Sequence, residues 1–206
     1  MPATTTLLLD GFWGRPWRYG GLRRALQAAY GRAEIFHYNS SGLVLLETLA
    51  QRFIADVRRR NEPINVVAFS MGGLVVRAAR LLEPTLPIQR AVFMNVPHSG
   101  TLVAHLIPLP GVRQMRPGSE FLKQLDAAPW DIPTLAIWCP GDLIVVPGSS
   151  ARWARANQII RCTVPGHAWP FHSPSVRRAV VAFFKEENVS PNIAPQTSRI
   201  EHGSAA

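Results

Sequence analysis

The chain has 206 residues, of which 47% are hydrophobic and 17% are charged. This balance excludes a disordered, fibrous or low-complexity protein, and a chain of this length buries about 70% of its unfolded surface in one core. The formal net charge is +9, carried almost entirely by arginine, because only Lys123 and Lys185 are lysines. The arginines are spread along the chain at helical spacing, so we expect no nucleic-acid partner. The positive charge is still compatible with a weak contact with an anionic membrane surface.

The two ends of the sequence predict little structure of their own. The N-terminal residues show neither a basic region followed by an apolar stretch nor a membrane-crossing span, so we expect a cytoplasmic location. Residues 1–187 are expected to form a single domain, and residues 188–206, which lack periodicity, a mobile tail outside it. Cys139 and Cys162 lie in apolar runs and not at the spacing of metal ligands, so neither a metal nor another cofactor is expected.

Short runs rich in aliphatic and β-branched residues alternate with longer amphipathic segments. The runs predict strands at residues 5–9, 34–38, 65–69, 91–95, 134–139 and 158–163, and the segments predict helices at residues 17–30, 43–60, 71–82 and 174–187. Most of the strands are continuously apolar, as in a sheet buried on both faces. The alternation predicts an α/β fold, a mostly parallel central sheet with helices on both faces. Residues 98–129 contain prolines and no strand, so we expect them to lie across the edge where such sheets bind ligands.

Ser70 lies between the third predicted strand and the following helix, within the sequence A-F-S-M-G of residues 68–72. A serine nucleophile on such a turn needs small residues two before and two after it, because the strained turn brings those backbones together. Ala68 and Gly72 meet this need. The turn also aims the first helical amides at the space above Ser70, where Met71 N–H could hold an oxyanion. The alternative is a serine that only caps the helix.

A serine nucleophile needs a base, and the base needs an acid that orients it. Asp142 follows the predicted strand at 134–139, and His167 follows the next strand on a loop rich in glycine and proline. Taken singly, they are also an ordinary turn carboxylate and a loop histidine. The order Ser70, Asp142, His167, each just past a strand, is the order of α/β-hydrolases. His172 is the rival base, but it directly precedes a helix start, where a surface or capping role is expected.

The loop after the first strand is expected to supply a second oxyanion donor, the amide of Phe12, with Gly11 allowing the backbone to turn inward. The alternative is an ordinary glycine-rich turn. Apolar residues on loops at the same edge are candidates for an acyl pocket, and for each one ordinary loop packing is the alternative. The candidates are Trp13, Trp17, Leu102, Leu106, Val145 and Trp169.

Four separated motifs resemble those of the α/β-hydrolase superfamily, in particular its small triacylglycerol lipase and esterase branch. D-G-F-W-G resembles the oxyanion loop, V-V-A-F-S-M-G-G the nucleophile turn and N-V-P-H-S-G-T the segment after the next strand. P-G-D-L-I-V-V-P and G-H-A-W-P-F-H-S-P resemble the acid and histidine loops, and the spacing from His167 to Pro174 matches that of lipases. Asp10 stands where relatives have histidine, and Ala68 where they have glycine.

The resemblance implies an enzyme without a cofactor that hydrolyses carboxylic esters of small molecules or lipids, with a minimal cap or short lid. Ser70 would be the nucleophile, His167 the base and Asp142 the orienting acid, with Phe12 and Met71 forming the oxyanion hole. An acyltransferase or thioesterase could use the same residues. A non-catalytic hydrolase-like domain that binds lipid or protein is the alternative of a different class. The sequence sets neither the acyl-chain length nor the oligomeric state.

Overall fold

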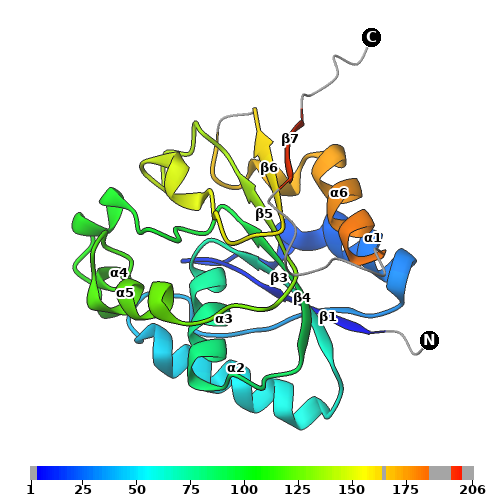
Figure 1. Cartoon of the computed structure of the whole chain (residues 1–206), viewed down its shortest axis with the longest axis horizontal. Helices are drawn as coiled ribbons and strands as arrows, with labels where there is room; N and C mark the ends of the chain where they lie inside the picture. The colour runs from blue at the N-terminus through cyan, green and yellow to red at the C-terminus, as the bar shows by residue number, and fades with distance from the viewer. Residues whose placement is uncertain (1–3, 164–165, 186–195, 201–206) are drawn as a thin grey trace.

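The computed structural model describes residues 4–163, 166–185 and 196–200. Within them the chain forms a seven-stranded sheet in the order β2-β1-β3-β4-β5-β6-β7, in which all neighbours are parallel (Figure 1). The strands are β1 Thr5–Leu9, β2 Ala33–Ile35, β3 Ile64–Phe69, β4 Ile88–Met94, β5 Thr134–Trp138, β6 Gln158–Cys162 and β7 Gln196–Ile200. Because the strands are parallel, their carboxyl ends share one edge of the sheet, the carboxyl edge.

Helices cover both faces of the sheet (Figure 1). The α-helices are α1 Gly20–Tyr30, α2 Leu46–Arg60, α3 Met71–Leu82, α4 Pro110–Arg113, α5 Glu120–Ala127 and α6 Pro174–Lys185. The short 3₁₀ helices are η1 Pro16–Tyr19, η2 Leu102–His105, η3 Gly148–Ala151 and η4 Trp169–Phe171. α2, α3 and α5 pack on one face, and α1 and α6 on the other. This three-layer arrangement is the predicted one.

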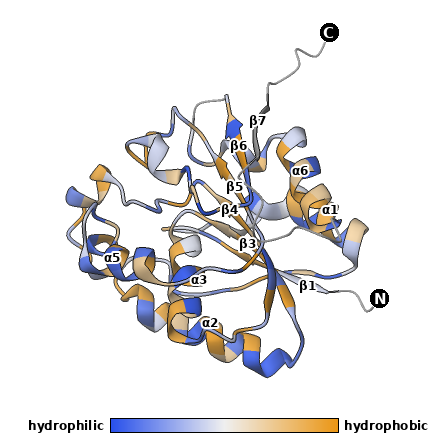
Figure 2. Cartoon of the chain, viewed as in Figure 1, coloured by the Kyte–Doolittle hydropathy of each residue, from blue (hydrophilic) through white to orange (hydrophobic). Residues whose placement is uncertain are grey.

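Two apolar layers form the core, one on each side of the sheet. β3 is buried along its whole length, so its side chains contribute to both layers. The helices contribute one apolar stripe each; in α2, for example, the buried residues Leu46, Leu49, Phe53 and Val57 recur at helical spacing. Figure 2 shows the corresponding alternation of hydrophobic and hydrophilic residues along α2 and α3.

The strand order creates a crevice between β1 and β3. The chain passes from β1 to β2 in one direction across the sheet and from β3 to β4 in the other, so the loops that follow β1 and β3 diverge at the carboxyl edge. Ligands of open parallel sheets bind at such a switch point. The structure therefore places the loop of Gly11 and Phe12 beside the turn of Ser70.

Some element boundaries differ from those predicted. The helix expected at 17–30 is divided into η1 and α1, with Gly20 and Gly21 at the junction. The helix expected from residue 43 begins at Leu46, because Gly42 has a φ of 80° and Leu45 is extended. The strand expected at 34–38 ends at Ile35, where pairing with β1 stops.

The C-terminal segment also differs from its expected position outside the fold. Gln196–Ile200 forms β7, which pairs in parallel with β6 at the edge of the sheet (Figure 1). The remaining tail residues, 188–195 and 201–206, lie outside the described residues. In the described parts of the chain, every helix is too short or too polar to cross a lipid bilayer.

Candidate active site

Ser70 occupies a strained turn between β3 and α3. Its φ is 51° and its ψ is −126°, a conformation that non-glycine residues rarely adopt. Its backbone N–H continues the ladder of the sheet by donating to Met94 O at 2.9 Å, and the residue is 6% exposed. The turn therefore combines a backbone anchored to β4 with a side chain at the carboxyl edge.

Small residues let three pieces of backbone meet around this turn. A Cβ atom on Gly72 would lie 2.5 Å from Asp10 O and 2.9 Å from Leu9 O, so only glycine allows α3 to approach the end of β1 this closely. A Cβ atom on Gly11 would lie 2.7 Å from Ser70 Cβ. The loop after β1 thus packs directly against Ser70, as its position at the switch point requires.

His167 links Ser70 to Asp142 through its two ring nitrogens. Its Nε2 lies 2.9 Å from Ser70 Oγ, and its Nδ1 lies 2.6 Å from Asp142 Oδ2. The imidazole is 14% exposed and packs on the ring of Phe69, with the ring centroids 4.6 Å apart. Residues separated by as many as 97 positions in the sequence are therefore brought into one hydrogen-bonded line.

The carboxylate of Asp142 is fixed by its own turn. Its Oδ1 accepts the amides of Ile144 at 2.8 Å and Val145 at 2.9 Å, which leaves Oδ2 for His167. The side chain is 0% exposed. Hydrogen bonds to both oxygens thus satisfy this buried carboxylate and fix its orientation. Asp142 does accept hydrogen bonds from local amides, as the simpler interpretation predicted. Those bonds use only Oδ1, however, and Oδ2 contacts His167.

The other candidate groups lie elsewhere. His172 is exposed, and its amide closes η4 by donating to Trp169 O at 2.9 Å. Asp131 pairs with Arg80 at 2.5 Å on the α3 side of the sheet. Asp10 lies in the loop after β1. Of these groups, none is hydrogen-bonded to His167 in the described structure.

Asn95 is a site residue that sequence reasoning missed. It follows β4 with a φ of 47°, is 0% exposed, and donates from Nδ2 to His167 O at 2.7 Å and to Cys139 Sγ at 3.5 Å. It therefore ties the ends of β4 and β5 to the loop that carries the imidazole. The available signal was an amide at the end of an otherwise apolar strand, at a position where asparagine tolerates positive φ.

Phe12 and Met71, the residues expected to supply the oxyanion donors, are both close to Ser70: Phe12 lines the same pocket as Ser70, and Met71 directly follows Ser70 in the chain. Met71 is the first residue of α3, where amides have no acceptor within the helix, and among the described residues no acceptor is bonded to Phe12 N–H. Asp10 shapes the loop of Phe12: its two oxygens accept the amides of Gly11 at 2.7 Å and Arg15 at 2.6 Å. The carboxylate thus holds the loop through backbone hydrogen bonds.

A tyrosine also supports this loop from the side of β2. The hydroxyl of Tyr38 donates to Asp10 O. Burial, together with the nearby carboxylate of Asp10, raises the pKa of Tyr38 far above its usual range, so the hydroxyl stays protonated and remains a donor.

A small apolar pocket of about 40 Å³ lies beside Ser70. It is lined by Phe12, Ser70, Pro97, Thr101, Val103, Ala104, Ile107, Val112, Met115, Ile144 and Val145. Loops after β1, β4 and β5 and the helix α4 contribute these residues. The segment 98–129 therefore covers the carboxyl edge, as expected, and forms much of one wall of the pocket.

Among the residues expected to line an acyl pocket, only Val145 does so. Trp13, Trp17, Leu102, Leu106 and Trp169 are instead 43% to 81% exposed. None of these five lines the pocket beside Ser70, because a large apolar side chain on a loop can point outward as readily as inward and carries no periodicity that tells the two apart. All five are exposed on segments that follow strands of the sheet.

No cluster of potential metal ligands occurs in the described ranges, where groups of three or more histidine, cysteine or carboxylate side chains are absent. Cys139 and Cys162 are both buried and free.

Comparison with known proteins gives matches of structure and none of sequence. No protein-family model matches the chain, and no curated protein matches its sequence. The phospholipase PlaB from Legionella pneumophila is 17% identical with a TM-score of 0.56, over 65% of this chain and 38% of that one. A monoacylglycerol lipase from Paleococcus ferrophilus is 16% identical with a TM-score of 0.66, over 88% and 95%. An α/β hydrolase from a Mar Chica lagoon metagenome is 16% identical with a TM-score of 0.68, over 88% and 91%.

This chain has the α/β-hydrolase fold. The match to the metagenomic hydrolase and the monoacylglycerol lipase extends over most of both chains, and the parallel sheet with helices on both faces agrees with it. The predicted fold and the resemblance to lipases and esterases of this fold are thereby confirmed. The chain spans 38% of the phospholipase, and at these identities the likeness establishes the fold alone.

Proposed function

We propose that this chain is a serine hydrolase that cleaves carboxylic esters. The observation that carries the proposal is the hydrogen-bonded line from Ser70 Oγ through His167 to Asp142, at 2.9 and 2.6 Å. An imidazole in this position removes the hydroxyl proton as the oxygen attacks, and a carboxylate behind it holds the reactive tautomer. The names of structurally similar proteins, which are lipases and hydrolases, agree with the proposal.

The reaction proceeds in two steps through an acyl-enzyme. Ser70 Oγ attacks the ester carbonyl while its proton passes to His167 Nε2, and the imidazolium then protonates the departing alcohol. Water, deprotonated by the same nitrogen, attacks the acyl-enzyme and releases the acid. The Asp142 carboxylate accepts from Nδ1–H and stabilises the imidazolium, and its two hydrogen bonds from the amides of Ile144 and Val145 hold it in this orientation.

The amides of Phe12 and Met71 stabilise the tetrahedral oxyanion in both steps. They belong to two backbone segments that Gly11 and Gly72 bring within contact distance of each other. Because the positions of both segments are set by the sheet, the donors need no rearrangement when charge develops on the oxygen. The N-terminal end of α3 adds a favourable dipole.

The acyl group enters the apolar pocket beside Ser70. At about 40 Å³ the pocket is far below the roughly 300 Å³ of small-molecule sites, so it favours short acyl chains. Long chains would have to displace η2 and the adjoining residues up to Ile107.

A fluorophosphonate probe tests the proposal directly, because it reacts only with an activated serine. The folded wild-type protein is expected to be labelled and to hydrolyse p-nitrophenyl acetate, whereas Ser70→Ala does neither. Ser99→Ala is the matched control, since Ser99 is exposed on the loop after β4, and it should behave as wild type. An unlabelled wild-type protein, or labelling that survives in Ser70→Ala, would favour the non-catalytic alternative.

A further inference from the structure

The positive charge of this protein is distributed unevenly between its two helical layers. On α2 and α3, every arginine except Arg52 forms an ion pair with an acidic residue. α1 and α6 contain no acidic residue, and none of their cations forms an ion pair within the described part of the chain. These cations are Arg23, Arg24, Arg177, Arg178 and Lys185. The α1–α6 face therefore carries cations without an acidic partner among the described residues, whereas most cations of α2 and α3 are neutralised by ion pairs.

Four of these cations lie where they do not stabilise their helices. Arg23 and Arg24 are the fourth and fifth residues of α1, and Arg177 and Arg178 are the fourth and fifth of α6. The N-terminal end of a helix carries a positive partial charge, so cations near it are unfavourable, and an anion there is attracted by dipole and side chains together. Arg177 has a structural role, since it donates to Phe171 O at 3.2 Å and His172 O at 3.4 Å. Helix stability does not explain the positions of the other three.

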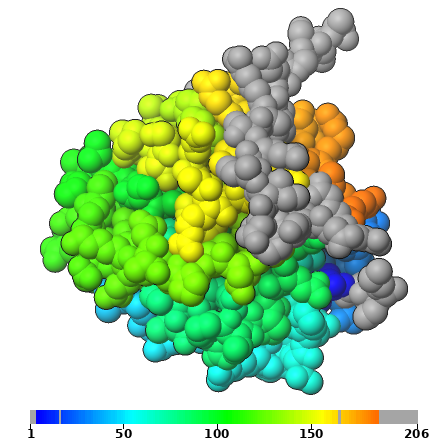
Figure 3. Space-filling view, viewed as in Figure 1, coloured from blue at the N-terminus to red at the C-terminus, as the bar shows by residue number. Residues whose placement is uncertain are grey.

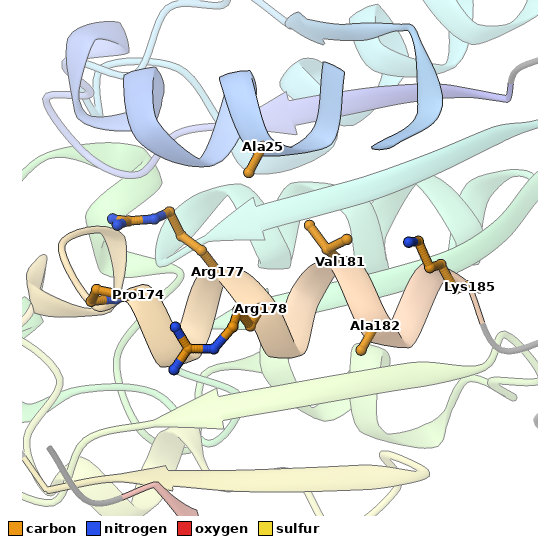
Figure 4. Close-up of a pocket in the computed structure, with 7 residues that line it drawn as sticks. All are labelled: Ala25, Pro174, Arg177, Arg178, Val181, Ala182 and Lys185. Atoms are coloured by element: carbon orange, nitrogen blue, oxygen red, sulfur yellow. The ribbon is translucent and has the colours of Figure 1, made fainter. Parts of the chain in front are cut away.

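A groove with an apolar floor separates the two helices. Its volume is about 510 Å³, and it is lined by Ala25, Pro174, Arg177, Arg178, Val181, Ala182 and Lys185. Figure 4 shows Ala25 of α1 facing Arg177 and Val181 of α6, whereas Arg178 and Ala182 project from the side of α6 that is turned away from α1. In the space-filling view α6 lies at the surface on one flank of the molecule (Figure 3). Cations over an apolar floor suit an amphiphile with an anionic head.

Exposed tryptophans adjoin the basic ends of both helices. Trp17 is 68% exposed in η1, which leads directly into α1, and Trp169 is 43% exposed in η4, which precedes α6. Trp13, 67% exposed, lies in the loop before η1. Tryptophan partitions into the headgroup region of a bilayer while nearby arginines reach its phosphates. The combination of arginines with exposed tryptophans favours a lipid surface over a nucleic acid. Arginines alone would be enough to bind the phosphates of a nucleic acid.

We propose that the α1–α6 face docks this protein onto a membrane surface of anionic phospholipids. Arg23, Arg24 and Arg178 contact the phosphates, and the exposed tryptophans enter the headgroup region. Because α1 and α6 begin at the carboxyl edge, docking turns the edge that carries Ser70 toward the lipid. The proposal goes beyond the proposed esterase activity, since binding does not require a reactive Ser70.

Vesicle sedimentation tests the proposal. The full chain is mixed with vesicles of phosphatidylcholine alone or of phosphatidylcholine and phosphatidylglycerol in equal amounts. The test variant is Arg23→Gln/Arg24→Gln/Arg178→Gln; Arg177 is retained because it donates to Phe171 O at 3.2 Å. The control, Arg52→Gln/Arg58→Gln/Arg59→Gln on α2, removes the same charge from the opposite face. Thermal unfolding and hydrolysis of soluble p-nitrophenyl acetate verify that both variants are folded.

Wild type and control are expected to bind the anionic vesicles and not phosphatidylcholine, with binding weakened by salt. The test variant should bind at least about tenfold more weakly, since each cation near an anionic surface contributes to affinity. Equal binding by test and control variants would overturn the proposal, as would equal binding to both vesicles. If the protein bound duplex DNA more strongly than the anionic vesicles, or if inorganic phosphate released it from them, the ligand would be a different anion and the proposal would fail. Vesicle binding is also measured with Ser70→Ala, which should bind as wild type does. The membrane proposal is thereby tested independently of the esterase proposal.

Discussion

Asp142 is the most constrained side chain of the site. It is fully shielded from solvent, and three hydrogen-bond partners occupy its two oxygens. The imidazole of His167 is held behind its reactive nitrogen by Asp142 and by the ring of Phe69, and Asn95 donates to the backbone carbonyl of the same residue. At the scale of single residues, the orientation of the proposed base therefore depends on groups that do not touch the substrate.

The substitution Asp142→Asn should lower kcat by about 10⁴-fold, because an amide donates to Nδ1 and leaves the proton on Nε2, which then cannot accept from Ser70. Burial and packing are nearly unchanged, so the melting temperature should fall only modestly. Asp131→Asn is the control: Asp131 is an exposed carboxylate paired with Arg80 and should leave kcat unchanged. Near-normal turnover of Asp142→Asn on p-nitrophenyl acetate would assign the orienting role to another acid.

At the scale of elements, β7 extends the folded domain beyond residue 187, where the sequence predicted its end. It pairs with β6 over the whole of Gln196–Ile200, and it covers the edge of the strand that leads into the His167 loop. An unpaired strand edge exposes amide and carbonyl groups and promotes aggregation. The C-terminal segment therefore protects one edge of the sheet, whereas the other edge ends in the short strand β2.

Truncation after Pro195 should lower the melting temperature by several degrees, because it removes the hydrogen bonds of β7 and uncovers β6. Truncation after Ile200 serves as the control, since it removes residues 201–206 and leaves β7 in place. The comparison is made by thermal unfolding at equal protein concentration, with light scattering to follow aggregation. Identical melting curves for the two truncations would show that β7 contributes nothing to stability.

At the scale of the whole molecule, a buried cluster around His98 joins segments that are distant in the sequence and contributes to the stability of the fold. His98, on the loop after β4, is 2% exposed and stacks on Trp153 with ring centroids 4.6 Å apart. Arg77 of α3 lies 3.4 Å from its Nδ1 and pairs with Asp126 of α5 at 2.7 Å. Burial, reinforced by the positive charge of Arg77, lowers the pKa of His98 well below its usual value.

The stability of the fold should therefore decrease as the pH falls below about 6.5, the pKa of histidine in an unfolded chain. Below that pH the unfolded state binds a proton that folded His98 does not, so the free energy of unfolding drops by up to about 1.4 kcal/mol per pH unit from this group. Urea unfolding of wild type and His98→Asn at neutral and mildly acidic pH measures the difference. If the free energy of unfolding changed equally with pH in both proteins, the prediction would be contradicted.

The acyl pocket leads to a prediction about chain length. Ester hydrolysis should be fastest on acetyl and butyryl esters of p-nitrophenol and slow on palmitoyl esters, because the pocket is only about 40 Å³. Ile107→Ala, which enlarges the pocket, should shift the optimum toward longer chains. Leu106→Ala is the matched control, since Leu106 is 81% exposed and does not line the pocket. An unchanged profile in Ile107→Ala, or a palmitoyl preference in wild type, would place the acyl group elsewhere.

The sequence by itself determined the alternation of strands and helices, and with it the predicted parallel sheet. It also determined the local turn at Ser70, since a small-x-Ser-x-small pattern between an apolar strand and an amphipathic helix is a short-range signal. The positions of Asp142 and His167 after later strands predicted that they would meet, because parallel strands end at one edge. In the structure they do lie in hydrogen-bond contact, while their catalytic roles stay predictions.

Only the tertiary structure decided which residues face one another across elements. The role of Asn95 depends on a loop 72 positions away, and the pocket is assembled from four separate segments. The sequence predicted scattered arginines, but in the described structure ion pairs neutralise most arginines of α2 and α3 and none of those on α1 and α6, because pairing depends on which acids lie nearby in space. β7 likewise has no periodic pattern of its own and takes its conformation from the exposed edge of β6.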